Sequence, residues 1–129
     1  MEQCKSGKSV LIVDDSATMR RMVRTSLRDL PGVEYQEAGN GLEAIERLAL
    51  GPIDLMIVDL NMPDMHGLEV IRFVRQQPGY KETPIIVLTT RGDEESRTAT
   101  LAAGANCYLT KPFQPDDMAG RVRELLPLA

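Results

Sequence analysis

The chain of 129 residues has no tryptophan, one histidine and only two cysteines. Cys4 lies in a polar segment and Cys107 in an apolar one, so the sequence argues against a structural disulfide and is typical of a reducing compartment. Neither cysteine has histidine or cysteine companions at the spacing of a zinc site. These scarcities argue against a disulfide-stapled secreted domain and against a zinc domain.

Long apolar runs are also missing. No stretch approaches the roughly 20 apolar residues that span a bilayer, and residues 1–9 are polar, without the apolar core of a signal peptide. We therefore expect no membrane insertion and a cytoplasmic location. The net charge of −4 argues against nucleic acid as a partner.

Positive charge gathers in one place along the chain. Arg20, Arg24 and Arg28 are spaced by four and so share one face of a helix. Two interpretations stay open from the sequence: a solvated helix face, or a docking surface for an acidic partner protein.

The sequence alternates regularly between two apolar patterns. Short apolar runs are typical of strands that are covered on both faces. They occur at residues 10–13, 33–37, 53–58, 85–88 and 106–109. Between and after these runs, helical spacing of apolar residues and helix-ending Gly and Pro predict helices. These are expected within residues 19–30, 40–50, 68–77, 93–103 and 115–126.

The second of these helices has a distinct start signal. Asn40 is expected to be its N-cap, and Glu43, three residues later, to complete a capping box. Its buried stripe is expected to consist of Ala44, Ile45, Leu48 and Ala49.

Five strands alternating with five helices predict right-handed crossovers and a parallel sheet with helices on both faces. The expected fold is an α/β three-layer sandwich of the flavodoxin-like (βα)5 type. Its strand order, 2-1-3-4-5, is taken from known folds of this type rather than from the sequence. One domain is expected over residues 8–127, after a flexible tail of residues 1–7, with no residues left for a DNA-binding or catalytic domain.

Polar side chains follow four of the five predicted strands. Asp14 and Asp15 follow the first, Asp59 the third, Thr89 the fourth and Lys111 the fifth. The carboxyl ends of parallel strands meet at one edge of a sheet, where functional crevices lie, and neighbouring strands are about 4.8 Å apart. We therefore expect these five side chains to converge.

Three converging carboxylates repel one another and need protons or a cation at neutral pH. Mg²⁺ suits them, because it binds through one or two carboxylates and keeps several waters. Phosphoryl transfer needs positive charge and hydrogen-bond donors around the phosphoryl oxygens, which Mg²⁺, Lys111 and the Thr89 hydroxyl can supply. Asp59, on the central strand, is the favoured nucleophile.

Four segments of the chain resemble the motifs of the receiver domain of bacterial response regulators. They are residues 11–16, 59–67, 87–90 and 108–113. The similarity runs from about Lys8 to Leu126. Within the family, residues 16–23 are most similar to the single-domain chemotaxis regulators of the CheY type.

The resemblance implies a ligand set for Mg²⁺. Asp15 and Asp59 are expected to coordinate the ion directly, together with the backbone carbonyl of Asn61. Asp14 is expected to act through a metal-bound water. Asp59 is then expected to accept a phosphoryl group from the phosphohistidine of a histidine kinase.

The same resemblance implies a switch. Lys111 is expected to pair with the phosphoryl oxygens and to precede a cis peptide bond to Pro112. Thr89 is expected to move toward the phosphoryl group and Tyr108 to turn inward. This shift reshapes the surface of the fourth helix, fifth strand and fifth helix, where a target such as a flagellar motor switch component docks.

Three further residues border the predicted site. Thr90 stands where the family has a smaller residue and is expected to narrow phosphodonor access. Arg91, together with Asn61, is expected to set the lifetime of the acyl phosphate. His66 is expected to be solvated rather than a phosphate relay.

The leading functional prediction is a stand-alone, monomeric phosphoacceptor switch in chemotaxis, which is not an enzyme. The alternative is a phosphorelay carrier that passes the phosphoryl group to a histidine phosphotransfer protein. A phosphohydrolase is disfavoured, because Asn61 stands where such enzymes place a general acid. An FMN-binding protein is disfavoured, because no Ser/Thr/Gly-rich loop follows the first strand.

Overall fold

A computed structural model describes residues 8–62, 64–90 and 92–126. The predicted tail, the predicted domain end at residue 127, and Arg91 lie outside the described residues. The strands are β1 (Lys8–Val13), β2 (Val33–Ala38), β3 (Leu55–Asp59), β4 (Ile85–Thr89) and β5 (Cys107–Thr110). The helices are α1 (Ala17–Ser26), α2 (Gly41–Leu50), α3 (Gly67–Gln76), α4 (Glu94–Ala103) and α5 (Pro115–Leu125), with a short 3₁₀ helix, η1 (Pro78–Tyr80).

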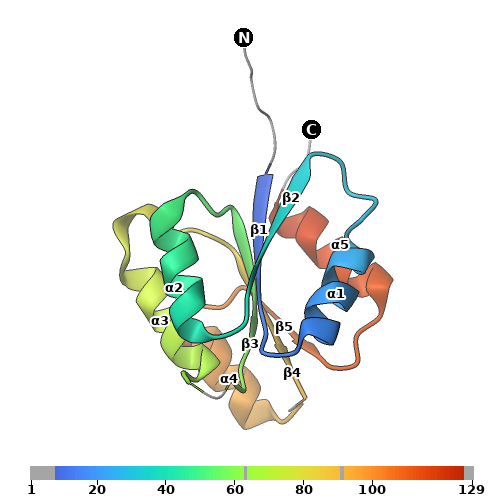
Figure 1. The fold of residues 1–129 in the computed structure, drawn as a ribbon. Coiled ribbons are helices and arrows are strands. Elements are labelled where there is room, and N and C mark those ends of the chain that lie inside the picture. The colour runs from blue at the N-terminus through green and yellow to red at the C-terminus, as the bar shows by residue number, and fades with distance from the viewer. Residues whose placement is uncertain (1–7, 63, 91, 127–129) are drawn as a thin grey trace.

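The five strands form one parallel sheet in the order β2-β1-β3-β4-β5, which confirms the predicted fold class and strand order. Helices α1 and α5 cover one face of the sheet, and α2, α3 and α4 cover the other (Figure 1). All strands point the same way, so their carboxyl ends share one rim. Among the described residues, no helix is long and apolar enough to cross a membrane.

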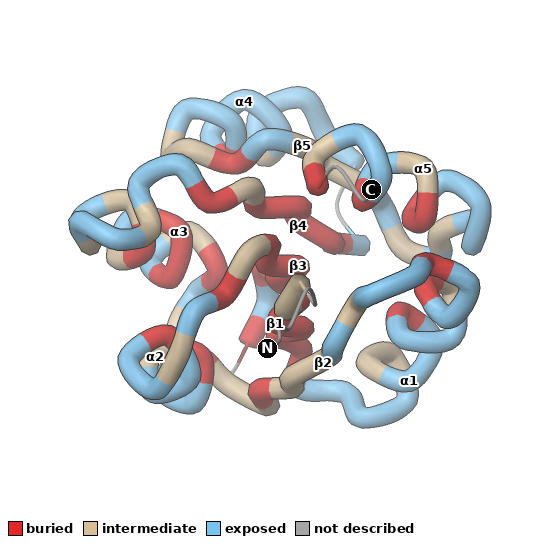
Figure 2. Tube along the Cα trace, turned by 90° about the horizontal axis from the view of Figure 1, so that it is seen from above, coloured by how far each residue is buried: buried red, intermediate tan, exposed pale blue. Residues whose placement is uncertain are grey.

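The core consists of two apolar layers, one on each face of the sheet. Alternate side chains of a strand point to opposite faces, so β1 sends Leu11 and Val13 toward α2 and α3, and Val10 and Ile12 toward α1 and α5. All residues of β3 and β4 are buried, and the buried positions gather around the sheet in Figure 2. Burial on both faces explains why these strands are continuous apolar runs in the sequence.

Helix α2 differs from its prediction in two respects. Its buried residues are Gly41, Ala44 and Leu48, whereas Ile45 is partly buried and Ala49 is exposed. Successive helical residues are turned by roughly 100°, so Ala49 lies well outside the narrow stripe that faces the sheet. The predicted stripe was therefore too wide.

The predicted capping box of α2 is only half present. The Asn40 side chain accepts a hydrogen bond from the Glu43 N–H at 2.8 Å, as expected of an N-cap. The Glu43 carboxylate, however, accepts from the Gly39 N–H at 2.6 Å instead of from the N–H of Asn40. It therefore reaches one residue further back than the motif predicts.

Candidate functional site

Three carboxylates meet at the rim where the strands end. Asp14 directly follows β1, Asp59 is the last residue of β3, and Asp15 is next to Asp14. One oxygen of each lies within 4.8 Å of the others. Asp14 and Asp59 are 2% and 4% exposed, whereas Asp15 is exposed. The rim therefore holds two buried acidic groups beside one that water can reach.

Backbone and side-chain contacts hold the Asp14 segment in place. Asp14 Oδ1 accepts from the Ser16 N–H at 2.9 Å. Ser16 in turn caps α1, because its hydroxyl accepts from the Met19 N–H at 3.2 Å. The Arg20 guanidinium reaches back from α1 to the Asp14 carbonyl oxygen. These contacts fix the direction in which the Asp14 carboxylate points.

Lys111 lies beside two of the carboxylates, those of Asp14 and Asp59. Its Nζ is 3.0 Å from Asp14 Oδ2 and 3.4 Å from Asp59 Oδ1, and its side chain is 13% exposed. The Lys111 N–H donates to the Thr89 carbonyl at 2.7 Å, which ties the end of β5 to the end of β4. The expected cis bond between Lys111 and Pro112 is confirmed.

The electrostatics of the site favour a bound cation. Burial raises the pKa of Asp59, and the neighbouring charge of Asp14 raises it further. The Lys111 ammonium and the Asn61 N–H, which donates to Asp59 Oδ1 at 3.3 Å, act in the opposite direction. Three carboxylates face one ammonium here, so two negative charges are left uncompensated when all are ionised. A hard divalent ion with oxygen ligands matches that charge and donor set.

The other predicted site residues lie around this cluster. Thr89 ends β4 and is fully buried. Asn61 is exposed and lies two residues after Asp59. Tyr108 is partly buried on β5 and packs against the apolar layer under α2 and α3. Thr90 is exposed. The roles assigned to these side chains stay predictions.

The arginine face of α1 is partly exposed, at Arg24 and Arg28, and partly bonded within the chain. Arg20 Nε donates to Glu37 Oε1 at 2.8 Å, and Arg24 Nη1 lies 3.1 Å from Glu37 Oε2. Arg20 therefore joins α1, β2 and the Asp14 segment. Both charges are visible in the sequence, but their pairing depends on how α1 packs beside β2, which the sequence pattern does not specify.

His66 is exposed, as predicted, and has a local structural role. It is the N-cap of α3, where its Nδ1 accepts from the Leu68 N–H at 3.1 Å. The Glu69 carboxylate accepts from the His66 N–H at 3.2 Å. The sequence reasoning overlooked this cap, which the pair His66 and Glu69 could have indicated by its spacing of three.

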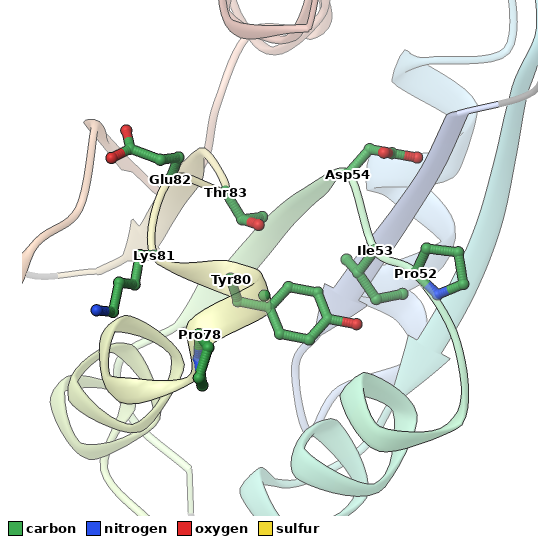
Figure 3. Close-up of a pocket in the computed structure, with 9 residues that line it drawn as sticks. Pro52, Ile53, Asp54, Pro78, Tyr80, Lys81, Glu82 and Thr83 are labelled. Carbon is green, nitrogen blue, oxygen red and sulfur yellow. The ribbon is translucent and has the colours of Figure 1, made fainter.

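One cavity, of about 500 Å³, has none of Asp14, Asp15, Asp59 and Lys111 among its lining residues, which Figure 3 shows. Its walls come from the segment before β3 and from the η1 turn before β4, and include Asp54, Tyr80 and Thr83. It therefore opens at the rim where the strands begin. A smaller cavity, of about 180 Å³, lies between α3 and α4, and Asn61 and Thr100 are among its lining residues.

Comparison with known proteins places this geometry in a family. Residues 10–123 match the family described as "Response regulator receiver domain". The chemotaxis protein CheY1 of Helicobacter pylori is 40% identical over 118 residues, which cover 91% of this chain and 95% of CheY1.

Solved structures give the same result. The chemotaxis response regulator CheY4 of Vibrio cholerae superposes with a TM-score of 0.85 at 39% identity, over 93% of this chain and 99% of CheY4. The Mn²⁺-bound form of the response regulator Rcp1 has a TM-score of 0.81 at 29% identity, over 95% of this chain and 97% of Rcp1.

Proposed function

The chain belongs to the response regulator receiver domain family, and we propose that it accepts a phosphoryl group on Asp59 from a histidine kinase in a Mg²⁺-dependent reaction. The observation that carries this proposal is the cluster of Asp14, Asp15 and Asp59 with Lys111 beside it. The response regulator Rcp1, which is 29% identical to this chain and has a known Mn²⁺-bound form, supports binding of a divalent ion.

Asp14, Asp15 and Asp59 are the side chains that would hold the ion, with the Asn61 backbone carbonyl as a further ligand. When bound, Mg²⁺ supplies positive charge to the phosphoryl oxygens. An Asp59 carboxylate oxygen attacks the phosphorus of the phosphohistidine. A phosphorus–oxygen bond forms as the phosphorus–nitrogen bond breaks, and the imidazole leaves with the electron pair of the broken bond.

Lys111 and Thr89 act on the transferred group. Lys111 Nζ is already 3.4 Å from Asp59 Oδ1, so it can pair with a phosphoryl oxygen attached to that side chain without crossing the site. The Thr89 hydroxyl is the candidate donor to a second oxygen. Because the product stays on the protein, we propose a phosphoacceptor switch and not an enzyme with a separate substrate.

We place the output of the switch on the surface formed by α4, β5 and α5. Tyr108 lies on β5 and is only partly buried, so an inward turn can change that surface. The relatives named as chemotaxis proteins support a role in chemotaxis. We propose on that basis a chemotaxis-type kinase, a target in flagellar motor control and a location in the cytoplasm. Transfer from Asp59 to a histidine phosphotransfer protein would instead favour the phosphorelay alternative.

The test is intact-mass analysis after incubation with acetyl phosphate and Mg²⁺. We expect one phosphoryl adduct, which disappears in EDTA and in Asp59→Asn. The matched control is Asp54→Asn, which changes the aspartate just before the same strand, at the opposite rim. An adduct that persists in Asp59→Asn, or that forms equally in EDTA, would refute the proposal.

A further inference from the structure

The connection between β3 and α3 is bonded to a helix that takes no part in the proposed chemistry. Asp64 Oδ1 accepts from the Gly41 N–H at 3.1 Å, and Asp64 Oδ2 accepts from the Leu42 N–H at 3.2 Å. Each carboxylate oxygen therefore takes one backbone donor from the first turn of α2. Asp64 lies more than twenty positions after both Gly41 and Leu42 in the sequence.

These bonds complete the start of α2. The first N–H groups of a helix have no partner within the helix. The Asn40 side chain accepts from the N–H of Glu43. The Asp64 carboxylate accepts from the N–H groups of Gly41 and Leu42, the two residues that precede Glu43. The positive end of the helix dipole favours a carboxylate at this place, and the donated hydrogen bonds, first that of Gly41, lower the pKa of Asp64. The contact with the start of α2 therefore favours the ionised form of Asp64.

A close packing contact reinforces the bonds. A Cβ atom on Gly41 would lie only 2.7 Å from Met65 Cβ, so glycine is needed for Met65 to come this near. Met65 also packs against the apolar layer under α2 and α3. Two consecutive residues, Asp64 and Met65, thus fasten the connection to the start of α2.

The same connection contains Asn61, whose N–H donates to Asp59 Oδ1 at 3.3 Å. Asn61 is exposed, so burial of its own side chain does not fix its position. At the far end of the connection, the Gly67 N–H donates to the Leu60 carbonyl at 2.8 Å. The contacts of Asp64 and Met65 hold the second half of this connection against the start of α2.

We propose that Asp64 is a positioning residue, which holds the β3–α3 connection against α2 so that the Asn61 carbonyl faces the metal before the ion binds. This inference rests on the proposed Mg²⁺ site. Preorganised ligands bind an ion more tightly, because less conformational freedom is lost on binding. Asp64 does not touch the ion and acts only through the connection.

Mg²⁺ binding and the contact between Asp64 and α2 are thermodynamically linked in this proposal. If the α2 contact favours the binding conformation, bound Mg²⁺ must favour the α2 contact by the same factor. Hydrogen exchange of the Gly41 and Leu42 amides is therefore expected to slow when Mg²⁺ is added to the wild-type chain. This measurement needs no variant and does not depend on phosphoryl transfer.

The variant test is the Mg²⁺ dissociation constant, measured by calorimetric titration of the full chain. Asp64→Ala is expected to weaken binding roughly three- to tenfold, somewhat less than the loss of a partner bonded directly to a metal ligand. Asp64→Asn keeps only one of the two acceptor oxygens and loses the charge, so it is expected to weaken binding, but by less than Asp64→Ala. Glu46→Ala, which removes the same charge from the exposed face of α2, is the control for net charge and is expected to change nothing.

The outcomes separate this inference from the function on which it rests. A wild-type chain that binds no Mg²⁺ would overturn the proposed function. Wild-type binding with an unchanged dissociation constant in Asp64→Ala, or with unchanged exchange at Gly41 and Leu42, would overturn the positioning role alone. A merely structural role would lower the melting temperature of Asp64→Ala without changing its affinity for Mg²⁺.

Discussion

On the carboxylate side of the site, the segments after β1 and β3 are bonded to α1, α2 and β2. On the lysine side, α4 and β5 bury few of their side chains. Helix α4 buries only Thr100, and no residue of β5 is fully buried. Helix α3, which is equally long, buries three apolar residues and Gly67. Segments with few buried apolar contacts open at lower free energy. The carboxylate side is therefore suited to hold an ion, and the lysine side to change its conformation.

The largest effect is expected where the carboxylate side is packed most tightly. A Cβ atom at Gly67 would lie 2.7 Å from the Asp59 carbonyl oxygen and 2.7 Å from Leu60 Cα, both of them backbone atoms. Gly67→Ala is therefore expected to lower the free energy of unfolding by about 2 to 4 kcal/mol, measured by urea denaturation. Gly120→Ala in α5, where a Cβ meets nothing within 4 Å, is the control and is expected to gain up to about 1 kcal/mol. Equal changes in the free energy of unfolding for Gly67→Ala and Gly120→Ala would contradict the tight packing at Gly67.

The next largest effect concerns the far end of α4. The Arg75 guanidinium donates to the Gly104 carbonyl at 2.8 and 3.1 Å, to the Tyr80 carbonyl at 3.1 Å and to Asn106 Oδ1 at 3.0 Å. Arg75→Met removes these hydrogen bonds. Asn106 Oδ1 keeps the N–H of Ile85 and the Tyr80 carbonyl keeps that of Thr83, so the loss falls mainly on the Gly104 carbonyl. A decrease of about 2 kcal/mol in the free energy of unfolding is expected.

Arg72→Met is the control for Arg75, because Arg72 lies on the exposed face of the same helix. It is expected to change the free energy of unfolding by less than about 0.5 kcal/mol. Amide exchange at Gly104 is expected to accelerate only in Arg75→Met. If it did not, the end of α4 would be held by something other than Arg75.

A smaller effect, of opposite sign, is expected within α4. Thr100 is fully buried, and within the described part of the chain its hydroxyl has no hydrogen-bond partner. Thr100→Val removes that hydroxyl at nearly constant volume and is expected to raise the free energy of unfolding by about 1 kcal/mol. Thr100→Ser keeps the hydroxyl and loses the methyl group, so it is expected to be destabilising. A destabilised Thr100→Val would show that the hydroxyl contributes a favourable interaction.

The smallest effect is electrostatic and depends on pH. Because the pKa of Asp59 is raised in the folded chain above its ordinary 3.8, its effect on stability is most favourable at low pH and is lost as the pH rises through the raised pKa. Without metal, Asp59→Asn is therefore expected to melt a few degrees above the wild type at pH 7 and to lose this advantage near pH 3. Thermal unfolding followed by circular dichroism measures both. A variant that melts below the wild type at pH 7 would contradict the argument.

The strand-end residues were predictable because a parallel sheet gathers the carboxyl ends of its strands, whatever the details of packing. Each short apolar run located one strand, and the polar residues that follow four of the five runs located the site. Placing Asp14, Asp59 and Lys111 next to one another also needed the strand order 2-1-3-4-5, which came from known folds of this type.

The residues that hold the site in place were not predictable in the same way. Arg20 bonds to Glu37, Asp64 to the start of α2, and Arg75 to Asn106. These pairs lie far apart in the sequence and meet only because of how each helix crosses the sheet. The exposure of Ala49 has the same origin, since the sequence pattern gives the period of a helix but not the angle at which it faces its neighbours.

The common direction of the strands has a practical consequence. Strand β1 begins and helix α5 ends at the end of the molecule opposite the carboxylates (Figure 1). A chain tethered to a sensor surface through a linker beyond Lys8 or beyond Leu126 would therefore present Asp59 and Lys111 to the solution. Immobilisation from either direction is expected to leave phosphodonors and partner proteins equal access.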